Sequence, residues 1–373
     1  MLYIHIPFCK QKCSYCNFHF STSLKLKEEM ILALQKEIYF RKDELHNNLL
    51  ATLYFGGGTP SILSIDEVKK LMDSILKYFS FKNDIEITLE ANPDDLSQNY
   101  LKGLREIGIN RLSIGVQSFF EDDLKMMNRA HTNSQAEDCI KRSQDTGIEN
   151  ISIDLIYGSP TSHIEIWKQN LQKAVDLEVS HISSYALTIE PKTALDNWIE
   201  RGKISAPKEA EQNQEFYYMV DFLKNNGFEH YEISNFGKPD FYSKHNSSYW
   251  KYQPYLGIGP SAHSYDGKDL RSWNITNNPL YIKSLNENKL PTEKEILSEK
   301  DRYNELLMIG LRTSWGVDLE KIKDFSDEIQ EKFHKDIQSK ISEGILTIEN
   351  NHLKIPEKHW FFADGIASDL FII

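Results

Sequence analysis

The sequence has no excess of basic residues and no long hydrophobic run. It has 43 Lys and Arg against 55 Asp and Glu, a net charge of −12. Because binding to nucleic-acid phosphates needs an excess of Lys and Arg, this balance excludes a general nucleic-acid-binding protein. No segment approaches the roughly eighteen consecutive apolar residues of a transmembrane helix, and the N-terminus has no basic region with a small-residue cleavage site. We therefore expect a cytoplasmic protein without a transmembrane segment.

Cysteine is also rare, and its placement is the strongest signal in the sequence. Three of the four cysteines lie within eight residues, in Cys9-Lys-Gln-Lys-Cys13-Ser-Tyr-Cys16, and the fourth is Cys139. Three neighbouring cysteines cannot all pair, and adjacent ones strain a disulfide, so a disulfide framework is excluded. Thiolates at this spacing can instead bind one iron–sulfur cluster. On a cluster of four irons they would leave one iron open to a small molecule.

A structural zinc ion is the alternative metal. It would need His5 or His19 as the fourth ligand of a closed tetrahedral site. This alternative is weaker, because structural zinc sites usually take pairs of ligands from two separate loops, and no second Cys or Cys/His pair follows. We therefore predict a [4Fe–4S] cluster bound by Cys9, Cys13 and Cys16.

The first part of the chain alternates between short β-rich runs and amphipathic helices. Six alternations predict a parallel sheet with helices outside, which right-handed crossovers curl into an incomplete (β/α)6 TIM-like barrel. Functional residues should then follow the carboxyl ends of the strands. The expected strands are residues 2–6, 52–55, 85–90, 111–116, 151–156 and 181–187, and the expected helices lie near 27–42, 65–79, 97–107, 134–146, 165–177 and 209–226.

The last part of the chain changes character from about residue 298. Helices are expected at 301–312, 319–325 and 328–342, followed by a hairpin of 345–348 and 353–355. This order predicts a small winged-helix-like α+β domain, which we interpret as a cover for the substrate side or a partner surface. The expected division is therefore a barrel at 1–230, an aromatic and His-rich connecting segment at 231–297, and a C-terminal domain at 298–373.

Polar and flexible residues follow several of the expected strands. A Gly triplet at 56–58 allows close backbone approach to a ligand, and no Gly-Lys-Ser/Thr follows it, which excludes a phosphate loop. Glu90 ends the third strand and can accept hydrogen bonds from hydroxyl or amino groups. Arg129 has a planar, charged guanidinium group whose geometry suits a carboxylate. Asp154 is an acid in an otherwise apolar strand; it needs a partner there, which favours a functional role.

The motif Cys9-x-x-x-Cys13-x-Tyr15-Cys16 resembles the signature of the radical S-adenosylmethionine (SAM) superfamily. In that superfamily the amino and carboxylate groups of SAM chelate the open iron. An electron from the reduced cluster then cleaves the sulfonium to a 5′-deoxyadenosyl radical, and the cofactor carries the difficult chemistry. The Gly triplet resembles the superfamily segment that holds the SAM amino group.

Over nearly the whole chain, these segments resemble one branch of the superfamily: the oxygen-independent coproporphyrinogen III oxidases and the related HemW-type haem chaperones. One departure is Ser159-Pro160-Thr161-Ser162, where the family pattern is Leu-Pro-Gly-Gln, which puts the role of a glutamine there in doubt. The resemblance implies that SAM and the cluster contact Tyr3, Tyr15, Gly57, Gly58, Thr59, Glu90, Gln117, Arg129 and Asp154.

The most aromatic part of the chain contains His245-Asn246-Ser-Ser-Tyr249-Trp250. A lone histidine is more often structural than a ligand. Imidazole nevertheless binds haem iron, and aromatic walls can bury a tetrapyrrole, so His245 is a candidate haem ligand. The same segment resembles one associated with haem binding in the HemW-type proteins.

Two features favour a chaperone over an oxidase within this branch. The oxidases carry a fourth cysteine two residues after the third, where this chain has Phe18, and a longer N-terminal arm, where only Met1 and Leu2 precede Tyr3. We therefore expect a haem-binding protein that delivers haem to an acceptor, with a membrane-associated respiratory protein as one candidate. We expect it to lack the oxidative decarboxylation of coproporphyrinogen III. A radical SAM enzyme with another substrate is the third alternative.

Overall fold

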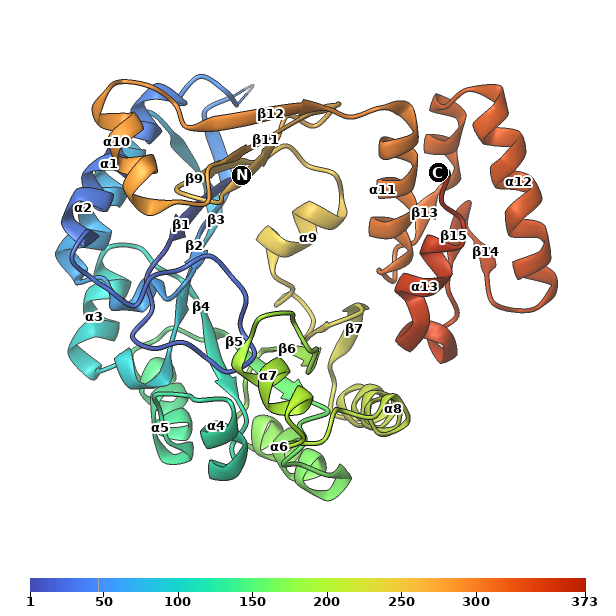
Figure 1. The fold of residues 1–373 in the computed structure, drawn as a ribbon, viewed down its shortest axis with the longest axis horizontal. Helices are drawn as coiled ribbons and strands as arrows, with labels where there is room; N and C mark the ends of the chain where they lie inside the picture. The colour runs from blue at the N-terminus through green and yellow to red at the C-terminus, as the bar shows by residue number, and fades with distance from the viewer. Residues whose placement is uncertain (46) are drawn as a thin grey trace.

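A nine-stranded sheet is the centre of the fold in a computed structural model that describes residues 1–45 and 47–373 (Figure 1). The strand order is β7-β8-β6-β5-β4-β3-β2-β1-β9, and neighbours from β1 to β6 pair in parallel. All six expected strands are present, which confirms the barrel-like α/β fold. They are β1 (Leu2–Ile6), β2 (Leu49–Gly57), β3 (Ser80–Ala91), β4 (Arg111–Gln117), β5 (Asn150–Tyr157) and β6 (His181–Ala186).

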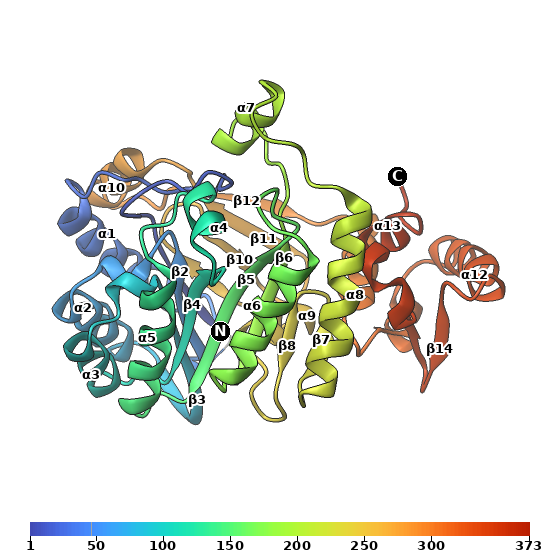
Figure 2. The same cartoon turned by 90° about the horizontal axis from the view of Figure 1, so that it is seen from below.

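The expected helices lie along the outer side of this sheet (Figure 2). Helix α2 begins with the capping box of Ser64 and Glu67, and its apolar stripe packs into the core, where Val68 and Leu71 are fully buried. Each helix thus covers the sheet with one apolar face. The helices are α1 (Lys27–Phe40), α2 (Ile65–Leu76), α3 (Gln98–Glu106), α5 (Asn133–Asp145), α6 (Ile164–Asp176) and α8 (Glu209–Asn225).

The segment expected to connect the two domains extends the sheet at both edges. Strands β7 (Glu229–Glu232) and β8 (Asn235–Gly237) form an antiparallel pair, and β8 pairs with β6. Strand β9 (Leu256–Ile258) runs parallel to β1. Strands this short carry too little alternation to be predicted. A separate antiparallel sheet contains β10 (His263–Tyr265), β11 (Leu270–Asn274) and β12 (Thr292–Ile296).

Four further helices are short, and the periodicity of the sequence does not predict them. They are α4 (Glu121–Met126), α7 (Ala194–Glu200), α9 (Lys244–Trp250) and α10 (Asn278–Asn286). Helix α7 projects from the body of the molecule (Figure 2), and α9 lies between the sheet and the C-terminal domain (Figure 1). Helix α9 carries the candidate haem segment, so this segment belongs to neither the barrel helices nor the C-terminal domain.

The C-terminal part combines helices with a small antiparallel sheet, as expected. Backbone hydrogen bonds from Ile233 N to Arg312 O (2.9 Å) and from Ser314 N to Tyr231 O (3.0 Å) attach it to the barrel. Residues 319–324 form a 3-10 helix in place of the expected α-helix. The elements are α11 (Glu299–Leu311), β13 (Val317–Asp318), α12 (Asp327–Ser342), β14 (Thr347–Glu349), β15 (His352–Lys354) and α13 (Ala363–Ser368).

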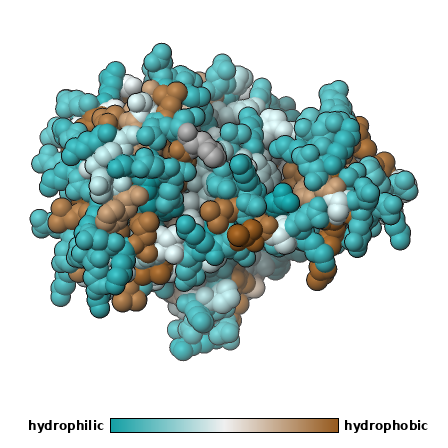
Figure 3. All heavy atoms as spheres, turned by 90° about the horizontal axis from the view of Figure 1, so that it is seen from above, coloured by the Kyte–Doolittle hydropathy of each residue, from teal (hydrophilic) through white to brown (hydrophobic). Residues whose placement is uncertain are grey.

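The surface agrees with the polar composition. On the face shown in Figure 3, hydrophilic side chains predominate and hydrophobic ones are scattered between them. Within the described part of the chain, no helix combines the length and apolarity needed to cross a membrane.

Candidate functional site

A cavity of about 850 Å³ opens at the carboxyl ends of the parallel strands and extends to the C-terminal domain. This is the place where a barrel of this kind gathers its functional residues. The cavity contains every site residue predicted from the sequence. Its lining includes Tyr3, Cys9, Cys13, Tyr15, Cys16, Gly57, Gly58, Thr59, Glu90, Gln117, Arg129, Asp154 and His245.

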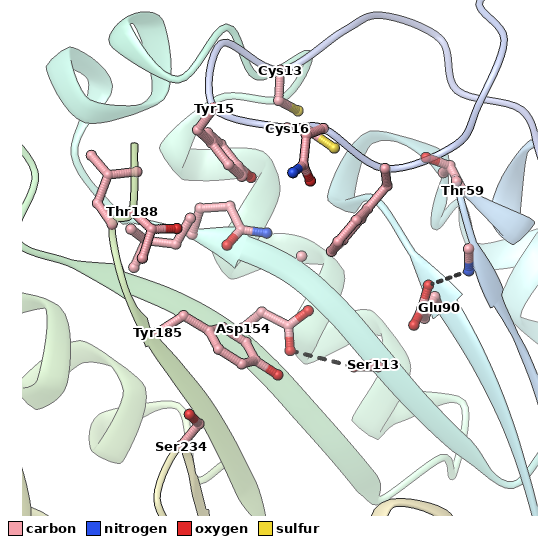
Figure 4. A pocket seen from close by; sticks show the side chains of 18 of the residues that line it. Cys13, Tyr15, Cys16, Thr59, Glu90, Ser113, Asp154, Tyr185, Thr188 and Ser234 are labelled. Carbon is pink, nitrogen blue, oxygen red and sulfur yellow. Dashed lines mark hydrogen bonds between the residues drawn. The ribbon is translucent and has the colours of Figure 1, made fainter. Parts of the chain in front are cut away.

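The three cysteines lie on the loop between β1 and α1, at one end of the cavity. Ser14 anchors this loop: its N–H donates to Met127 O (3.1 Å) and its hydroxyl donates to Met126 O (2.8 Å). The three thiols are half-buried and free, and Cys13 and Cys16 appear at the top of Figure 4. The loop is therefore held against α4, and its sulfurs lie on the cavity wall.

Polar side chains from other strands approach the sulfurs. Thr59 Oγ1 donates to Cys9 Sγ (3.5 Å), and Arg129 Nη1 donates to Cys13 Sγ (3.2 Å). Burial raises the pKa of the Cys9 thiol to about 11, so that thiol is neutral at pH 7 unless a cation or metal stabilises its thiolate. Donors beside a sulfur are what a bound iron–sulfur cluster uses to stabilise its negative charge.

The donor set fits a cluster better than a single metal ion. Within residues 1–45 and 47–373, no three His, Cys, Asp or Glu side chains converge on one ion. Thiolates of a [4Fe–4S] cluster bind separate irons and need not meet at one point. The histidines of the zinc alternative make other contacts: His5 Nε2 bonds His19 O (3.2 Å), and His19 Nε2 bonds Asn278 Oδ1 (2.7 Å).

The Gly triplet allows two backbone segments to pack closely. A Cβ on Gly58 would lie 2.5 Å from Phe8 O, at the start of the cysteine loop, and Gly57 has φ +108°. Thr59 N donates to Phe8 O (2.7 Å), which continues the contact. The sequence predicts that these glycines allow approach to a ligand; the close approach at Gly58 is to the chain's own backbone. Both functions are compatible, because Gly57 and Gly58 also line the cavity.

Two half-buried acids face the middle of the cavity (Figure 4). Glu90 accepts hydrogen bonds from Tyr54 Oη (2.8 Å) and Gly57 N (3.0 Å), and desolvation raises its pKa to about 7. Asp154 accepts from Ser113 Oγ (3.4 Å), and desolvation raises its pKa to about 6. Acids whose ionised form is disfavoured by burial gain from a cationic ligand, so this part of the cavity suits a cation.

Arg129 and Gln117 complete this end of the cavity. Arg129 Nη2 donates to Asn92 Oδ1 and to Gly115 O, both at 2.7 Å, and these bonds fix the guanidinium beside the cysteines. Gln117, at the end of β4, has φ +67°, a left-handed conformation that costs free energy in a residue other than glycine. Such strain is typical of functional positions.

The two predicted aromatic residues lie in different parts of the cavity: Tyr15 is at the cysteine end, and the Tyr3 ring lies towards His245, with ring centroids 6.4 Å apart. Tyr3 Oη bonds His5 Nδ1 (3.1 Å), and its ring stacks near Tyr54, with centroids 6.0 Å apart. Tyr15 packs against a small apolar cluster that includes Met127 and points into the cavity (Figure 4).

His245 lies at the other end of the cavity and is 1% exposed. Both ring nitrogens are engaged: Nδ1 bonds Thr52 Oγ1 (2.8 Å), and Nε2 bonds Tyr249 Oη (2.9 Å). The ring also stacks on Tyr54, with centroids 4.9 Å apart. Desolvation lowers the pKa of His245 to about 3, so the ring is neutral. In this conformation no lone pair of the imidazole is free for a metal.

Several lining residues were missed from the sequence. Tyr185 lies near the end of β6, Thr188 follows β6, and Ser234 follows β7 (Figure 4). Arg312 and Asp364 reach the cavity from the C-terminal domain. The rule that functional residues gather at the carboxyl ends of parallel strands could have identified Tyr185, Thr188 and Ser234. Nothing in the sequence places Arg312 and Asp364 at the cavity.

The segment that departs from the family pattern has its own structural role. Ser159 and Thr161 both donate to Asp123, at 3.1 Å and 2.6 Å, and Asp123 also accepts from Ser118 (2.8 Å). These hydroxyls satisfy a buried carboxylate, and they keep the loop after β5 attached to α4.

Known protein families match both parts of the chain. The profile described as radical SAM superfamily matches residues 3–174, and that described as HemN C-terminal domain matches residues 297–362. The protein "Heme chaperone HemW" of Lactococcus lactis is 35% identical, over 98% of this chain and 95% of that protein. The protein of the same name from Bacillus subtilis is 36% identical over 84% of each chain.

The solved structure of the radical SAM enzyme coproporphyrinogen III oxidase (HemN) from Escherichia coli has a similar fold. The TM-score is 0.85 and the sequence identity 23%, and the match covers 99% of this chain and 89% of that one. At this identity the match establishes the fold, including the arrangement of barrel and C-terminal domain.

Proposed function

The chain belongs to the HemW family of radical SAM proteins, and from this premise we propose that it is a haem chaperone. It would bind a [4Fe–4S] cluster and SAM at the cysteine end of the cavity and haem at the His245 end, and would transfer haem to an acceptor protein. The cytoplasm as its compartment and a membrane-associated respiratory protein as acceptor belong to the same proposal. The single observation that carries it is the continuity of one cavity between Cys13 and His245.

The cysteine end supplies the groups that a cluster and SAM need. Cys9, Cys13 and Cys16 would hold the cluster, which, when reduced with SAM bound, can supply an electron to the sulfonium. The acids Glu90 and Asp154 would accept hydrogen bonds from the amino and hydroxyl groups of SAM and balance its positive charge. Their raised pKa values favour this role, because a cationic ligand restores the ionised carboxylates.

The His245 end supplies an imidazole and aromatic walls. Among the described residues that line the cavity, His245 is the one imidazole, and the rings of Tyr3, Tyr54 and Tyr249 surround it. A cavity of this volume, with aromatic walls and a few polar groups, is typical of small-molecule and cofactor sites.

Tyr249 controls whether His245 can bind iron. In the structure the Tyr249 hydroxyl occupies Nε2 of His245 at 2.9 Å. If the Tyr249 side chain rotates away, Nδ1 can donate to Thr52 Oγ1, which leaves the lone pair of Nε2 free and fixes the neutral tautomer that ligates metals. Haem ligation by His245 thus requires the exchange of one hydrogen bond for one coordination bond.

A haem titration tests the proposal. We expect the wild-type chain to bind haem with a Soret band of a histidine-ligated iron, and His245→Ala to lose that band and to bind haem more weakly. His131→Ala is the matched control, because His131 is also a buried histidine but does not line the cavity. If the Soret spectrum and affinity of His245→Ala equal those of the wild type, His245 is not the ligand.

The alternative function is that of the related oxidase, which the shared fold makes relevant. The test gives the anaerobically reconstituted chain SAM, a reductant and coproporphyrinogen III, and measures the porphyrin products by mass spectrometry. We expect unchanged substrate, since Phe18, 72% exposed, stands where the oxidases carry a fourth cysteine. Loss of two carboxyl groups as carbon dioxide would make this chain an oxidase.

A further inference from the structure

We infer that a carboxylate-binding site lies where the cavity meets the C-terminal domain, formed by Arg312, which lines the cavity, and its neighbour Trp250 on α9, and that it binds a propionate of the tetrapyrrole. This inference rests on the proposed function, because haem is the ligand whose carboxylates it assigns. It adds a recognition site on a second domain to the cavity of the barrel.

One edge of the Arg312 guanidinium has no hydrogen-bond partner among the described residues. Nη1 forms an ion pair with Asp364, whereas Nε is buried without a hydrogen-bond partner in the described chain, and Nη2 donates to no residue of that chain. The edge formed by Nε and Nη2 is the one that binds a carboxylate with two parallel hydrogen bonds. A buried donor without a partner is costly, so a ligand that satisfies it gains affinity.

A second donor without a partner among the described residues belongs to the neighbouring side chain, Trp250. The guanidinium carbon of Arg312 is 5.6 Å from the centroid of the Trp250 ring, and Trp250 Nε1 is also buried without a partner among the residues described. Indole nitrogens usually find a partner when buried. Two unsatisfied donors on neighbouring side chains therefore point to one absent acceptor.

The backbone fixes Arg312 in this place. Ile233 N donates to Arg312 O (2.9 Å), and residues 232 and 313 form an antiparallel bridge, so β7 and the end of α11 are joined directly. Ile233 and Ser234 line the cavity together with Arg312. The site is thus part of the junction between the two domains, and does not depend on a freely moving surface side chain.

Helix α9 connects the candidate haem ligand to Trp250. Helix α9 carries His245 near its start and Trp250 at its end. In haem the iron lies at the centre of the macrocycle, and both propionates extend from one edge. A macrocycle whose iron is near His245 would therefore direct its carboxylates along α9 towards Trp250 and Arg312.

The test compares haem with haem dimethyl ester, in which the carboxylates are masked, in the same detergent buffer. We expect the wild type to bind haem about tenfold more tightly than the ester, and Arg312→Gln to bind both equally weakly. Trp250→Phe keeps an aromatic ring but removes Nε1, and should reduce the preference for haem by a smaller factor. Asp364→Asn should increase haem affinity and leave ester affinity unchanged, because the Asp364 carboxylate on Nη1 repels a propionate at the other edge of Arg312 and offsets the positive charge of Arg312.

Arg302→Gln is the matched control. Arg302 lies on α11, the helix that Arg312 caps. It also has an Nε without a partner among the residues described and stacks near Phe325, but it is not part of the cavity lining. If Arg302→Gln and Arg312→Gln lose haem affinity equally, the loss comes from the change in net charge and not from a specific contact of Arg312, and the inference is overturned. SAM affinity should not change in Arg312→Gln; a decrease would mean that the variant damages the whole cavity or that the carboxylate is that of SAM, which also overturns it.

The outcomes separate this inference from the proposed function. If the wild type binds neither haem nor its ester, haem binding itself is wrong. If it binds both with equal affinity and Arg312→Gln changes neither, haem binding stands and the propionate site is wrong.

Discussion

The two ends of the cavity differ in how their functional groups are engaged. At the cysteine end, three thiols from one short loop face the cavity, and Thr59 and Arg129 donate to two of them. At the other end, the imidazole of His245 already has partners on both nitrogens. The first end is ready to receive its ligand, whereas the second must exchange a contact before iron can bind. This difference suits a protein that holds one cofactor permanently and passes another on.

The largest expected effect tests the cysteine end of the cavity. Cys13→Ala should abolish the iron–sulfur absorbance and the iron content of anaerobically reconstituted protein, because three thiolates are needed to hold the cluster. Cys139→Ala is the control, since Cys139 is a fully buried thiol of helix α5 outside the cavity. A brown Cys13→Ala protein with full iron content would show that the cluster is bound elsewhere.

A smaller effect tests the His245 end of the cavity. His245→Ala should lower the free energy of unfolding of the haem-free chain by about 3 kcal/mol, because it leaves two hydroxyls, the buried one of Thr52 and the half-buried one of Tyr249, without their partner. Tyr249→Phe should cost only about 1 kcal/mol, yet should bind haem more tightly because Nε2 is free. Urea unfolding and haem titration measure these two quantities. A Tyr249→Phe chain with weaker haem binding would contradict the control of His245 by Tyr249.

The smallest effect concerns pH. Glu90 has a pKa raised to about 7 by desolvation, so it is mostly neutral at pH 6 and mostly ionised at pH 8. A cationic ligand binds the ionised carboxylate, and SAM affinity should therefore rise roughly tenfold from pH 6 to pH 8 and level off above this range. Equilibrium binding of SAM at several pH values measures it. Glu90→Gln should bind weakly with little dependence on pH; an unchanged slope in this variant would assign the titration to Asp154 or another group.

The sequence predicted the residues of the cysteine end more completely than those of the His245 end. Its residues follow predicted parallel strands, and the carboxyl ends of such strands meet at one edge, so the strand pattern alone is enough to group Glu90, Gln117 and Asp154. The helix periodicity was also sufficient for α2, whose capping box and apolar stripe are both present. Strands β7, β8 and β9 were missed, because three or four residues give no measurable alternation.

The sequence by itself determined the α/β architecture, the cysteine loop and the type of chemistry, since these follow from local periodicity and from ligands that are near neighbours in the chain. Only the tertiary structure decided which nitrogens of His245 are free and which residues of the C-terminal domain reach the cavity. The contact of Thr52 with His245, and the pairing of Arg312 with Trp250, join positions far apart in the chain. Such contacts depend on how whole elements pack, and no local pattern encodes them.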